Sequence, residues 1–372
     1  MPPRQPLSIL YVSQGRAREG AALGHARVRD ALALEPPRVG VRLGYEEIRP
    51  FSKLERLAAR PYRVPWGRDY YRLRWHLVRG LLARRAVQAR VRAERPDAIL
   101  FVTEQITFLM GSIQRRFPTA LSLDATTYDW TLTLEGLPLE GSSPPELRRF
   151  RSMNRQALER AALCVCWTDF VERGVRRLAP TARTTVLHPG LDLEAFQPGP
   201  RPPDRPEVRM LFVGGNWDRK GGPDLVAALK PQLGDSVRLD VVTDHPVPQQ
   251  PGVFVHRAAP ASAELRRLFA EADVCCLPSR ADLVPWVVVE ALASGLAIVA
   301  SDVGSIPELV GDAGLTVPPG DVRELRLALE TVAADEALRR RMGETGRRQA
   351  EQRYDARRNN PKLFGLLEEI AS

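Results

Sequence analysis

Short apolar runs alternate with helical patterns along the whole chain. In the first half, the apolar runs predict strands, and apolar positions spaced at helical period predict helices between them. The predicted strands are residues 7–13, 98–102, 120–123, 163–167 and 185–187, and the predicted helices are about residues 21–34, 72–93, 106–116 and 145–162. Strands without a polar face that alternate with helices are typical of a doubly wound parallel sheet.

The second half repeats this alternation after a stretch rich in proline. Its predicted strands are residues 208–213, 238–242, 253–255, 274–277, 296–300 and 315–317. Because proline cannot continue a helix or a central strand, we expect residues 196–207 to be a linker. A long helical pattern over about 333–371 follows, with interruptions expected near Tyr354 and Pro361.

These patterns predict an α/β protein with two Rossmann-like, doubly wound domains that face each other across a cleft. The expected division is an N-terminal domain over 1–195, a linker over 196–207, a C-terminal domain over 208–350 and a final helix over 351–372 that returns to the first domain. A chain of 372 residues with 44% hydrophobic composition is long enough for two cores of ordinary size.

The four cysteines stand inside apolar runs. Cys164 and Cys166 are separated by one residue and Cys275 and Cys276 are adjacent, so neither pair has the C-x-x-C spacing of a zinc or redox site. No run approaches the roughly 18 apolar residues of a membrane span. We therefore expect reduced core cysteines in a cytoplasmic protein.

Positive charge is concentrated in the first half of the chain. The first 200 residues carry 32 lysines and arginines against 20 acidic residues, whereas the rest carry 22 against 25. Within residues 53–95, arginines are interleaved with Tyr62, Trp66, Tyr70, Tyr71 and Trp75. This mixture suits an anionic membrane surface, and a solvated arginine-rich helix is the alternative. A nucleic-acid-binding role leaves the motifs of the second half unexplained, so no nucleic-acid partner is expected.

Asp282 and Glu290 lie eight positions apart, across a loop that opens a helix. An apolar run predicts a strand directly before this loop, which places the loop at the carboxyl edge of the sheet, where ligands bind in open α/β folds. The backbone at the helix start, over Val284, Pro285 and Trp286, suits the phosphates of a nucleotide. Glu290 suits the vicinal hydroxyls of a ribose. The alternative is that the two carboxylates are ordinary polar residues of a loop and of a packed helix.

A second cluster follows the strand predicted at 208–213. Two glycines and two cations lie between this strand and the next helix, namely Gly214, Gly215, Arg219 and Lys220. Cationic side chains beside converging backbone N–H groups hold a diphosphate and stabilise it as it leaves.

Together with residues 186–192, 290–295 and 301–310, these clusters resemble the family-4 glycosyltransferases, also described as glycosyl transferases group 1. The resemblance extends over residues 186–320. It implies the GT-B fold, a nucleotide-sugar donor held mainly by the second domain, and transfer that retains the anomeric configuration. It also implies that neither a metal ion nor another cofactor takes part.

The resemblance assigns roles to single residues. Lys220 matches the family's phosphate-binding lysine, and Glu290 matches the glutamate that holds the ribose. Asp282 stands where the family has a glutamate that approaches the sugar, and it is shorter by one methylene. Gly215 stands where the family has a phosphate-binding arginine, a role that Arg219 is expected to fill. Leu283-Val284-Pro285 replaces a glycine-rich loop, which limits how closely the backbone approaches the phosphates.

In the first domain, Gly15 resembles the family's glycine turn, which lets the acceptor or a donor phosphate approach the backbone. Asp124 follows a predicted strand at a place where the family more often has a histidine. It is a candidate for binding a hydroxyl of the donor sugar or steadying the transferring centre, and capping of a turn through Thr126 is the alternative. His25 and His188 are expected to be structural.

The favoured function is transfer of a hexose-like sugar from a nucleoside-diphosphate donor to a hydroxyl of a glycan, lipid or small-molecule acceptor. The expected catalytic residues are Asp124, Arg219, Lys220 and Asp282, and the expected substrate-binding residues are Gly15, Gly214, Gly215, Val284, Pro285, Trp286 and Glu290. The alternatives are a nucleotide-sugar epimerase of the same fold, an inactive sugar-nucleotide sensor, and a basic protein that binds membranes or nucleic acid. Residues 53–95 are the expected point of peripheral contact with the inner face of a membrane.

Overall fold

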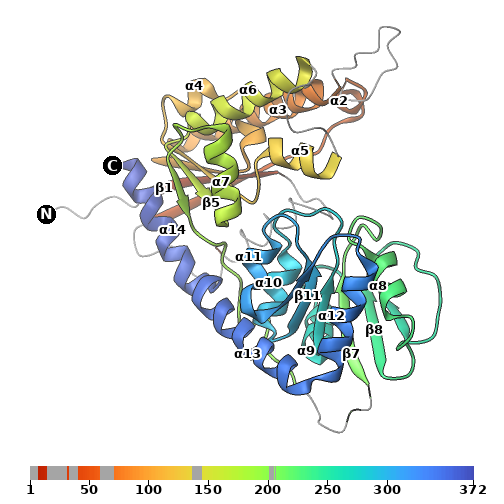
Figure 1. The fold of residues 1–372 in the computed structure, drawn as a ribbon. Helices are drawn as coiled ribbons and strands as arrows, with labels where there is room; N and C mark the ends of the chain where they lie inside the picture. The colour runs from red at the N-terminus through yellow and green to blue at the C-terminus, as the bar shows by residue number, and fades with distance from the viewer. Residues whose placement is uncertain are drawn as a thin grey trace, which may run out of the picture. The chain divides into compact units, whose positions relative to one another are not determined.

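The computed structural model describes residues 7–14, 32, 41–58, 71–135, 145–200, 205 and 207–372. The chain divides into two compact units (Figure 1). Unit 1 comprises Met1–Pro189 and Arg357–Ser372, and unit 2 comprises Gly190–Ala356. The described residues of the proline-rich stretch, 196–200, 205 and 207, belong to unit 2, and Phe196 is buried in the core of that unit.

Within the described residues, unit 1 is built on a six-stranded parallel sheet with the order β2-β1-β3-β4-β5-β6. Its strands are β1 (Leu7–Gln14), β2 (Val41–Ile48), β3 (Ala98–Val102), β4 (Thr119–Leu123), β5 (Leu163–Cys166) and β6 (Thr184–Val186). Its helical segments are α2 (Lys53–Ala58), α3 (Tyr71–Glu94), η1 (Glu104–Thr107), α4 (Gly111–Gln114), α5 (Thr127–Glu135), α6 (Pro145–Glu159), α7 (Asp169–Leu178) and most of α14 (Ala356–Ala371).

In unit 1, one observed strand has no predicted counterpart, and one predicted helix is replaced by two shorter segments. The sequence pattern does not predict β2, because this edge strand pairs with β1 alone and keeps several half-buried or exposed polar positions. The helix predicted over 106–116 is wrong, since two short segments, η1 and α4, stand there instead. Of the helix predicted over 21–34, only Leu32 lies within the described residues.

In the part of the chain that the structure describes, no helix has both the length and the apolar character that crossing a bilayer requires.

Unit 2 is built on a second parallel sheet with the order β12-β11-β10-β7-β8-β9. Its strands are β7 (Val208–Val213), β8 (Val237–Val242), β9 (Val253–His256), β10 (Val274–Leu277), β11 (Ala297–Ser301) and β12 (Gly314–Val317). Its helical segments are α8 (Gly222–Leu229), α9 (Ala263–Glu271), α10 (Trp286–Ala293), α11 (Ile306–Val310), η2 (Gly311–Ala313), α12 (Val322–Ala334) and α13 (Glu336–Arg353). Two doubly wound α/β units are therefore present, which confirms the expected fold class.

The helical pattern predicted over about 333–371 is interrupted twice, and the first break lies at Asp335, between α12 and α13. Helix α13 ends at Arg353 and α14 begins at Ala356, which confirms the break near Tyr354. The break expected at Pro361 is wrong, because α14 continues through this residue. Pro361 lies in the second turn of α14, where the helix gives up the hydrogen bond of one backbone N–H and remains otherwise continuous.

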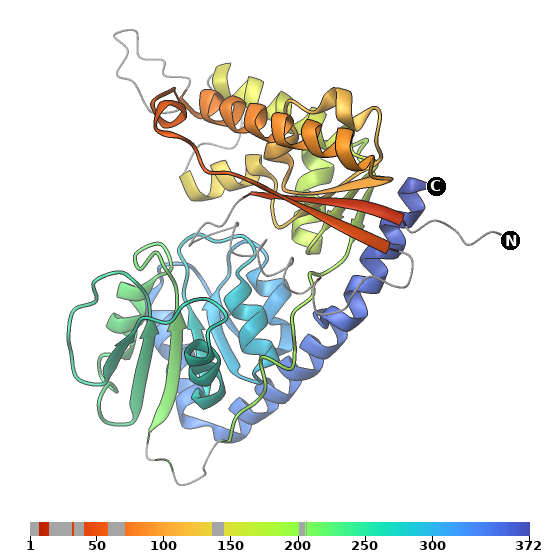
Figure 2. The ribbon, with the colours of Figure 1, turned by 180° about the vertical axis from the view of Figure 1, so that it is seen from behind.

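Each central strand of unit 2 contributes to two cores, because neighbouring residues of a strand point to opposite faces of the sheet. Leu211 packs in the core beside α9, α10 and α11, whereas Met210 and Phe212 pack in the core beside α8 and α12. Figure 1 shows α8 and α12 on one side of this sheet, and Figure 2 shows α9 on the other. Cys275 and Cys276 divide between the cores in the same way, and both are free and buried.

The strand order in each sheet reverses at one position. In unit 2 the chain adds β8 and β9 on one side of β7, and β10 then pairs with the other side of β7 and is followed by β11 and β12. In unit 1 the reversal lies between β1 and β3. The loops at the carboxyl ends of the two strands diverge at such a reversal, and ligands of open α/β sheets bind there.

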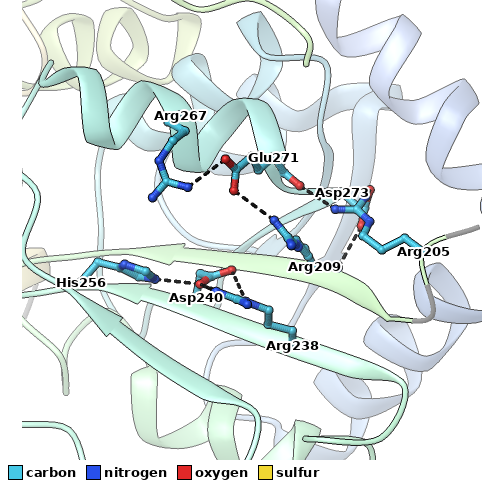
Figure 3. A network of polar contacts seen from close by, with 8 residues as sticks. All are labelled: Arg205, Arg209, Arg238, Asp240, His256, Arg267, Glu271 and Asp273. Carbon is cyan, nitrogen blue, oxygen red and sulfur yellow. Dashed lines mark hydrogen bonds and ion pairs between the residues drawn. The ribbon is translucent and has the colours of Figure 1, made fainter. Parts of the chain in front are cut away.

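A polar network lies on the α9 side of the second sheet (Figure 3). It consists of Arg205, Arg209, Arg238, Asp240, His256, Arg267, Glu271 and Asp273. Asp273 is buried and accepts hydrogen bonds from Arg205 Nη2 at 2.6 Å and from the backbone N of Arg209 at 2.8 Å. The carboxylate thus ties Arg205, before β7, and the start of β7 itself to the residue that precedes β10.

We predict that Asp273→Ala lowers the free energy of unfolding by about 2–4 kcal/mol, because it leaves a guanidinium and a backbone N–H without their shared acceptor. Urea unfolding followed by circular dichroism measures this change. Glu344→Ala is the control, since its pair with Arg340 is 57% and 80% exposed. Its expected cost is under about 0.5 kcal/mol, and equal costs for the two variants would contradict the prediction.

Candidate functional site

Two loops meet at the carboxyl edge of the second sheet. Residues 214–221 connect β7 to α8, and residues 278–285 connect β10 to α10. Because β7 and β10 are neighbours at the strand-order reversal, their following loops lie side by side. All of the residues that the sequence analysis selected in the second half, apart from Glu290 and Trp286, lie on these two loops.

Backbone contacts join the two loops. The backbone N of Arg280 donates to Arg219 O at 2.8 Å, and Arg219 Nη1 donates to Ala281 O at 2.8 Å. Gly221 has φ 75°, and a Cβ at this position would lie 1.9 Å from the Pro278 carbonyl oxygen. Only glycine therefore allows this approach.

An ion pair reinforces the same junction. Arg280 forms two hydrogen bonds with Asp224 of α8, at 2.7 and 2.8 Å. Hydrogen bonding to Asp224 raises the pKa of Arg280 above its usual value, and the nearby negative charges act in the same direction. The loop after β10 is thus fixed to the first turn of α8.

The two predicted phosphate-binding cations have different surroundings. Lys220 is mostly buried, and its Nζ pairs with Asp282 Oδ2. The side chain of Arg219 is held by the carbonyl of Ala281, while Asn216 Oδ1 accepts a hydrogen bond from the backbone N of Arg219 at 3.0 Å. Gly214 is buried beneath the stem of Lys220, because a Cβ there would lie 3.1 Å from Lys220 Cγ.

A third loop, after β11, holds the second half of the 278–285 loop. Ser305 donates from its backbone N and from Oγ to Leu283 O, at 2.9 and 2.5 Å. Gly304 has φ 60°, and a Cβ there would lie 2.5 Å from Asp282 O. The backbone of the loop after β11 therefore lies directly against Asp282 and Leu283.

Helix α10 begins at this place. Pro285 is its N-cap residue and contributes no side-chain capping hydrogen bond. The first backbone N–H groups of a helix have no acceptor within the helix, and the helix dipole favours an anion there. Val284 and Trp286 are partly exposed at this end. Glu290, one turn further along, is completely buried. Burial raises the pKa of Cys275 to about 12, and the charge of Glu290 acts in the same direction.

Of the four candidate residues in unit 1, the structure describes two, Asp124 and His188. Gly15 and His25 lie outside the described residues. Asp124 directly follows β4 and is partly exposed at the carboxyl edge of the first sheet. His188 makes a contact of 2.6 Å from Nδ1 to Trp167 O, and its own carbonyl accepts a hydrogen bond from Asn359 Nδ2. The structure thus gives His188 contacts within unit 1 that suit a structural role.

Glu104 is a further candidate that the sequence analysis did not select. It follows β3 at the strand-order reversal of the first sheet and is completely buried. Its Oε1 accepts a hydrogen bond from the backbone N of Thr127, and its Oε2 accepts one from Thr103 Oγ1 at 3.3 Å. Thr103 has φ 84°, a conformation that non-glycine residues rarely adopt and that often marks a functional segment. A carboxylate two positions after an apolar strand, separated from it by Thr103 alone, is the signal in the sequence that identifies this residue.

The environment of Glu104 shifts its titration. Burial raises the pKa of its carboxyl to about 7, the hydrogen bonds from Thr127 oppose this change, and the charge of Asp124 adds to it. The charge of Asp124 thus contributes to the raised pKa of Glu104 at the carboxyl edge of the first sheet.

We predict that this shift makes part of the stability depend on pH. Because the folded-state pKa of about 7 exceeds the ordinary value of 4.5, the folded protein binds the proton more tightly than the unfolded chain. The contribution is complete below pH 4.5 and is lost as the pH rises through 7. The wild type should thus lose up to about 3 kcal/mol of unfolding free energy relative to Glu104→Gln between pH 4 and pH 8. Urea unfolding across this range measures the difference, and a constant difference would contradict the shift.

Among the residues that the structure describes, no cluster of three or more histidine, cysteine, aspartate or glutamate side chains is arranged to hold a metal ion.

Part of the second unit matches a known protein family. Residues 207–335 match the family model described as glycosyl transferases group 1. The sulfoquinovosyl transferase SQD2 of Arabidopsis thaliana is 27% identical over 195 residues, which cover 47% of this chain and 38% of that protein. The chain spans less than half the length of this and the next curated relatives that it matches.

Solved structures resemble the chain over nearly its full length. The sucrose-phosphate synthase of Thermosynechococcus elongatus superposes with a TM-score of 0.73 at 18% identity, covering 99% of both chains. Anabaena HepE, solved in complex with UDP and glucose, superposes with a TM-score of 0.67 at 17% identity, covering 97% of this chain and 99% of the other. Residues 207–335 therefore form a domain of the glycosyl transferases group 1 family, in a chain whose two α/β units have the fold of GT-B glycosyltransferases.

Proposed function

We propose that this protein is a retaining glycosyltransferase of family 4 that transfers a sugar from a nucleoside-diphosphate donor to a hydroxyl acceptor. The observation that supports this most is the junction of two loops at the strand-order reversal of unit 2. There, Lys220, Arg219 and the start of α10 lie on adjacent loops, and all three favour an anion. The match of residues 207–335 to a glycosyltransferase family supports the same proposal.

The proposed reaction needs charge stabilisation more than a strong nucleophile. The acceptor hydroxyl oxygen bonds to the anomeric carbon on the face from which the diphosphate leaves, and a donor phosphate oxygen takes the hydroxyl proton. Lys220, Arg219 and the N-terminus of α10 stabilise the diphosphate as it gains negative charge. Glu290 accepts hydrogen bonds from the ribose. Asp124 of unit 1 binds a hydroxyl of the donor sugar or steadies the transferring centre.

The resemblance to family 4 supports transfer without a metal ion, with the positive charge supplied by the protein's own groups. The acceptor is proposed to be a glycan, a lipid-linked molecule or a small molecule.

A thermal-shift screen with UDP, GDP, ADP and TDP, each with its common sugar conjugates, tests the donor site. A ligand that binds only the folded protein raises the melting temperature, and ligand at about 100 times Kd adds about 2.7 kcal/mol. We predict a shift selective for one base that is lost in Lys220→Ala and in Glu290→Ala.

The control is Lys230→Ala, which removes an exposed lysine just after α8. This variant should keep the full shift. Full nucleotide binding by Glu290→Ala, or no shift of the wild type with any of the four nucleotides, would contradict the proposal.

We further propose that the protein works at the cytoplasmic face of a membrane, which it contacts through α2 and α3. Four leucines of these helices are unusually exposed, namely Leu54 at 79%, Leu57 at 48%, Leu77 at 36% and Leu81 at 42%. Lys53, Arg56 and Arg85 are exposed on the same two helices. Apolar side chains with neighbouring cations suit the boundary between acyl chains and anionic headgroups. Trp75 packs against Phe51 and His76, and Tyr62, Trp66 and Tyr70 lie outside the described residues.

Co-sedimentation with vesicles tests this contact. We predict binding to vesicles that contain phosphatidylglycerol, weak binding to pure phosphatidylcholine, and loss of binding as salt rises, because screening weakens attraction between exposed charges. Replacing Leu54, Leu57, Leu77 and Leu81 by serine should reduce binding at least tenfold. Unchanged binding by this variant would exclude the leucines as the contact.

A further inference from the structure

Lys220 and Asp282 form an ion pair between the two loops of the donor site. The lysine Nζ contacts Asp282 Oδ2, and the side chains are only 13% and 11% exposed. The residues are 62 positions apart in the chain, so only the neighbouring positions of β7 and β10 bring them together.

The carboxylate of Asp282 is occupied on both oxygens. Oδ1 accepts a hydrogen bond from the backbone N of Leu283 at 3.0 Å, and Oδ2 accepts one from Ser279 Oγ at 3.2 Å in addition to Lys220. A carboxylate has about four acceptor positions, so three donors leave little capacity for the hydroxyls of a sugar. These donors also fix the direction in which the carboxylate points.

The stem of Lys220 is fixed as well. It lies over Gly214, where a Cβ would come within 3.1 Å of Lys220 Cγ. The backbone bonds between Arg219 and the 280–281 segment keep the two loops in register. The lysine side chain is therefore fixed at two places, by packing along its methylene stem and by the Asp282 carboxylate at its ammonium group.

We infer that Asp282 is a positioning residue for Lys220, and that it acts on the donor diphosphate through the lysine and not by contact with the sugar. This inference rests on the proposed function. An ammonium group has three N–H donors, so one bond to Asp282 leaves two for phosphate oxygens. Fixing a long lysine side chain before the donor arrives removes rotamer entropy that binding would otherwise lose.

Binding measurements separate a positioning role from a sugar contact. Isothermal titration with UDP, UDP-glucose and uridine is carried out on the wild type, Asp282→Asn, Lys220→Met and the double variant, or with the corresponding compounds of the base that the thermal screen selects. Asparagine keeps the size of Asp282 and an acceptor for Leu283 N while removing the charge. Methionine keeps an apolar stem over Gly214.

The positioning role predicts that Asp282→Asn weakens UDP binding at least tenfold and UDP-glucose binding by the same factor, with uridine unchanged. The double variant should bind UDP within twofold of Lys220→Met alone, because both changes disable the same ammonium group. Asp218→Asn, which alters an exposed carboxylate on the same loop, is the matched control and should bind both ligands within twofold of the wild type.

Two results would overturn the inference while the proposed function stands. One is normal binding of UDP by Asp282→Asn with weakened binding of UDP-glucose, which assigns Asp282 to the sugar. The other is independent, multiplying losses in the double variant. If the wild type binds none of the nucleoside diphosphates, the proposed function fails and the positioning role falls with it.

Discussion

The pairing of β7 with β10 is the constraint on which the donor half of this protein depends. The two strands are joined in register by Val274 with Met210 and Cys275 with Leu211, although about 60 residues separate them in the chain. Because parallel strands end at the same edge, this pairing brings the loops 214–221 and 278–285 together. Without this strand pairing, nothing would bring the cations of one loop to the carboxylate of the other.

Packing at glycine positions lets the polar contacts form. Gly221 and Gly304 both have positive φ, and each stands where a side chain would overlap a carbonyl oxygen of the 278–285 loop. The close approach allows the Arg219 and Arg280 hydrogen bonds and encloses the Lys220–Asp282 pair away from bulk water. Ion pairs at an exposed surface contribute little, whereas a largely buried pair with further hydrogen bonds holds a definite geometry.

The first unit handles buried charge in a different way. Glu104 is enclosed at the carboxyl edge of its sheet, with hydrogen bonds from Thr127 and Thr103. Burial raises the pKa of this carboxyl to about 7. Both units thus place a buried carboxylate next to their strand-order reversal. In unit 2 the carboxylate faces a cation, whereas in unit 1 burial raises the pKa of the carboxyl toward neutral pH.

The amino-acid sequence is enough to predict the fold class and the central strands, because buried parallel strands are continuous apolar runs that can be recognised locally. It also selected Lys220 and Asp282 as candidates, since their positions match motifs of a known family, and Arg219 as the cation expected to replace the family's arginine, whose place Gly215 takes. Edge strand β2 was not recognisable, because half-exposed positions leave no such run. Pro361 was misread as a break, because the position of a proline within its helix depends on where that helix begins.

Contacts between distant side chains depend on the folded arrangement of the two sheets. Lys220 pairs with Asp282, which is 62 positions away in the chain. The buried Glu104 accepts a hydrogen bond from Thr127, which is 23 positions away. Local patterns carry no information on such distances, because they are set by strand order and by the register of parallel strands. Loops lie together at a sheet edge when their strands are neighbours in the sheet, whatever their separation in the sequence.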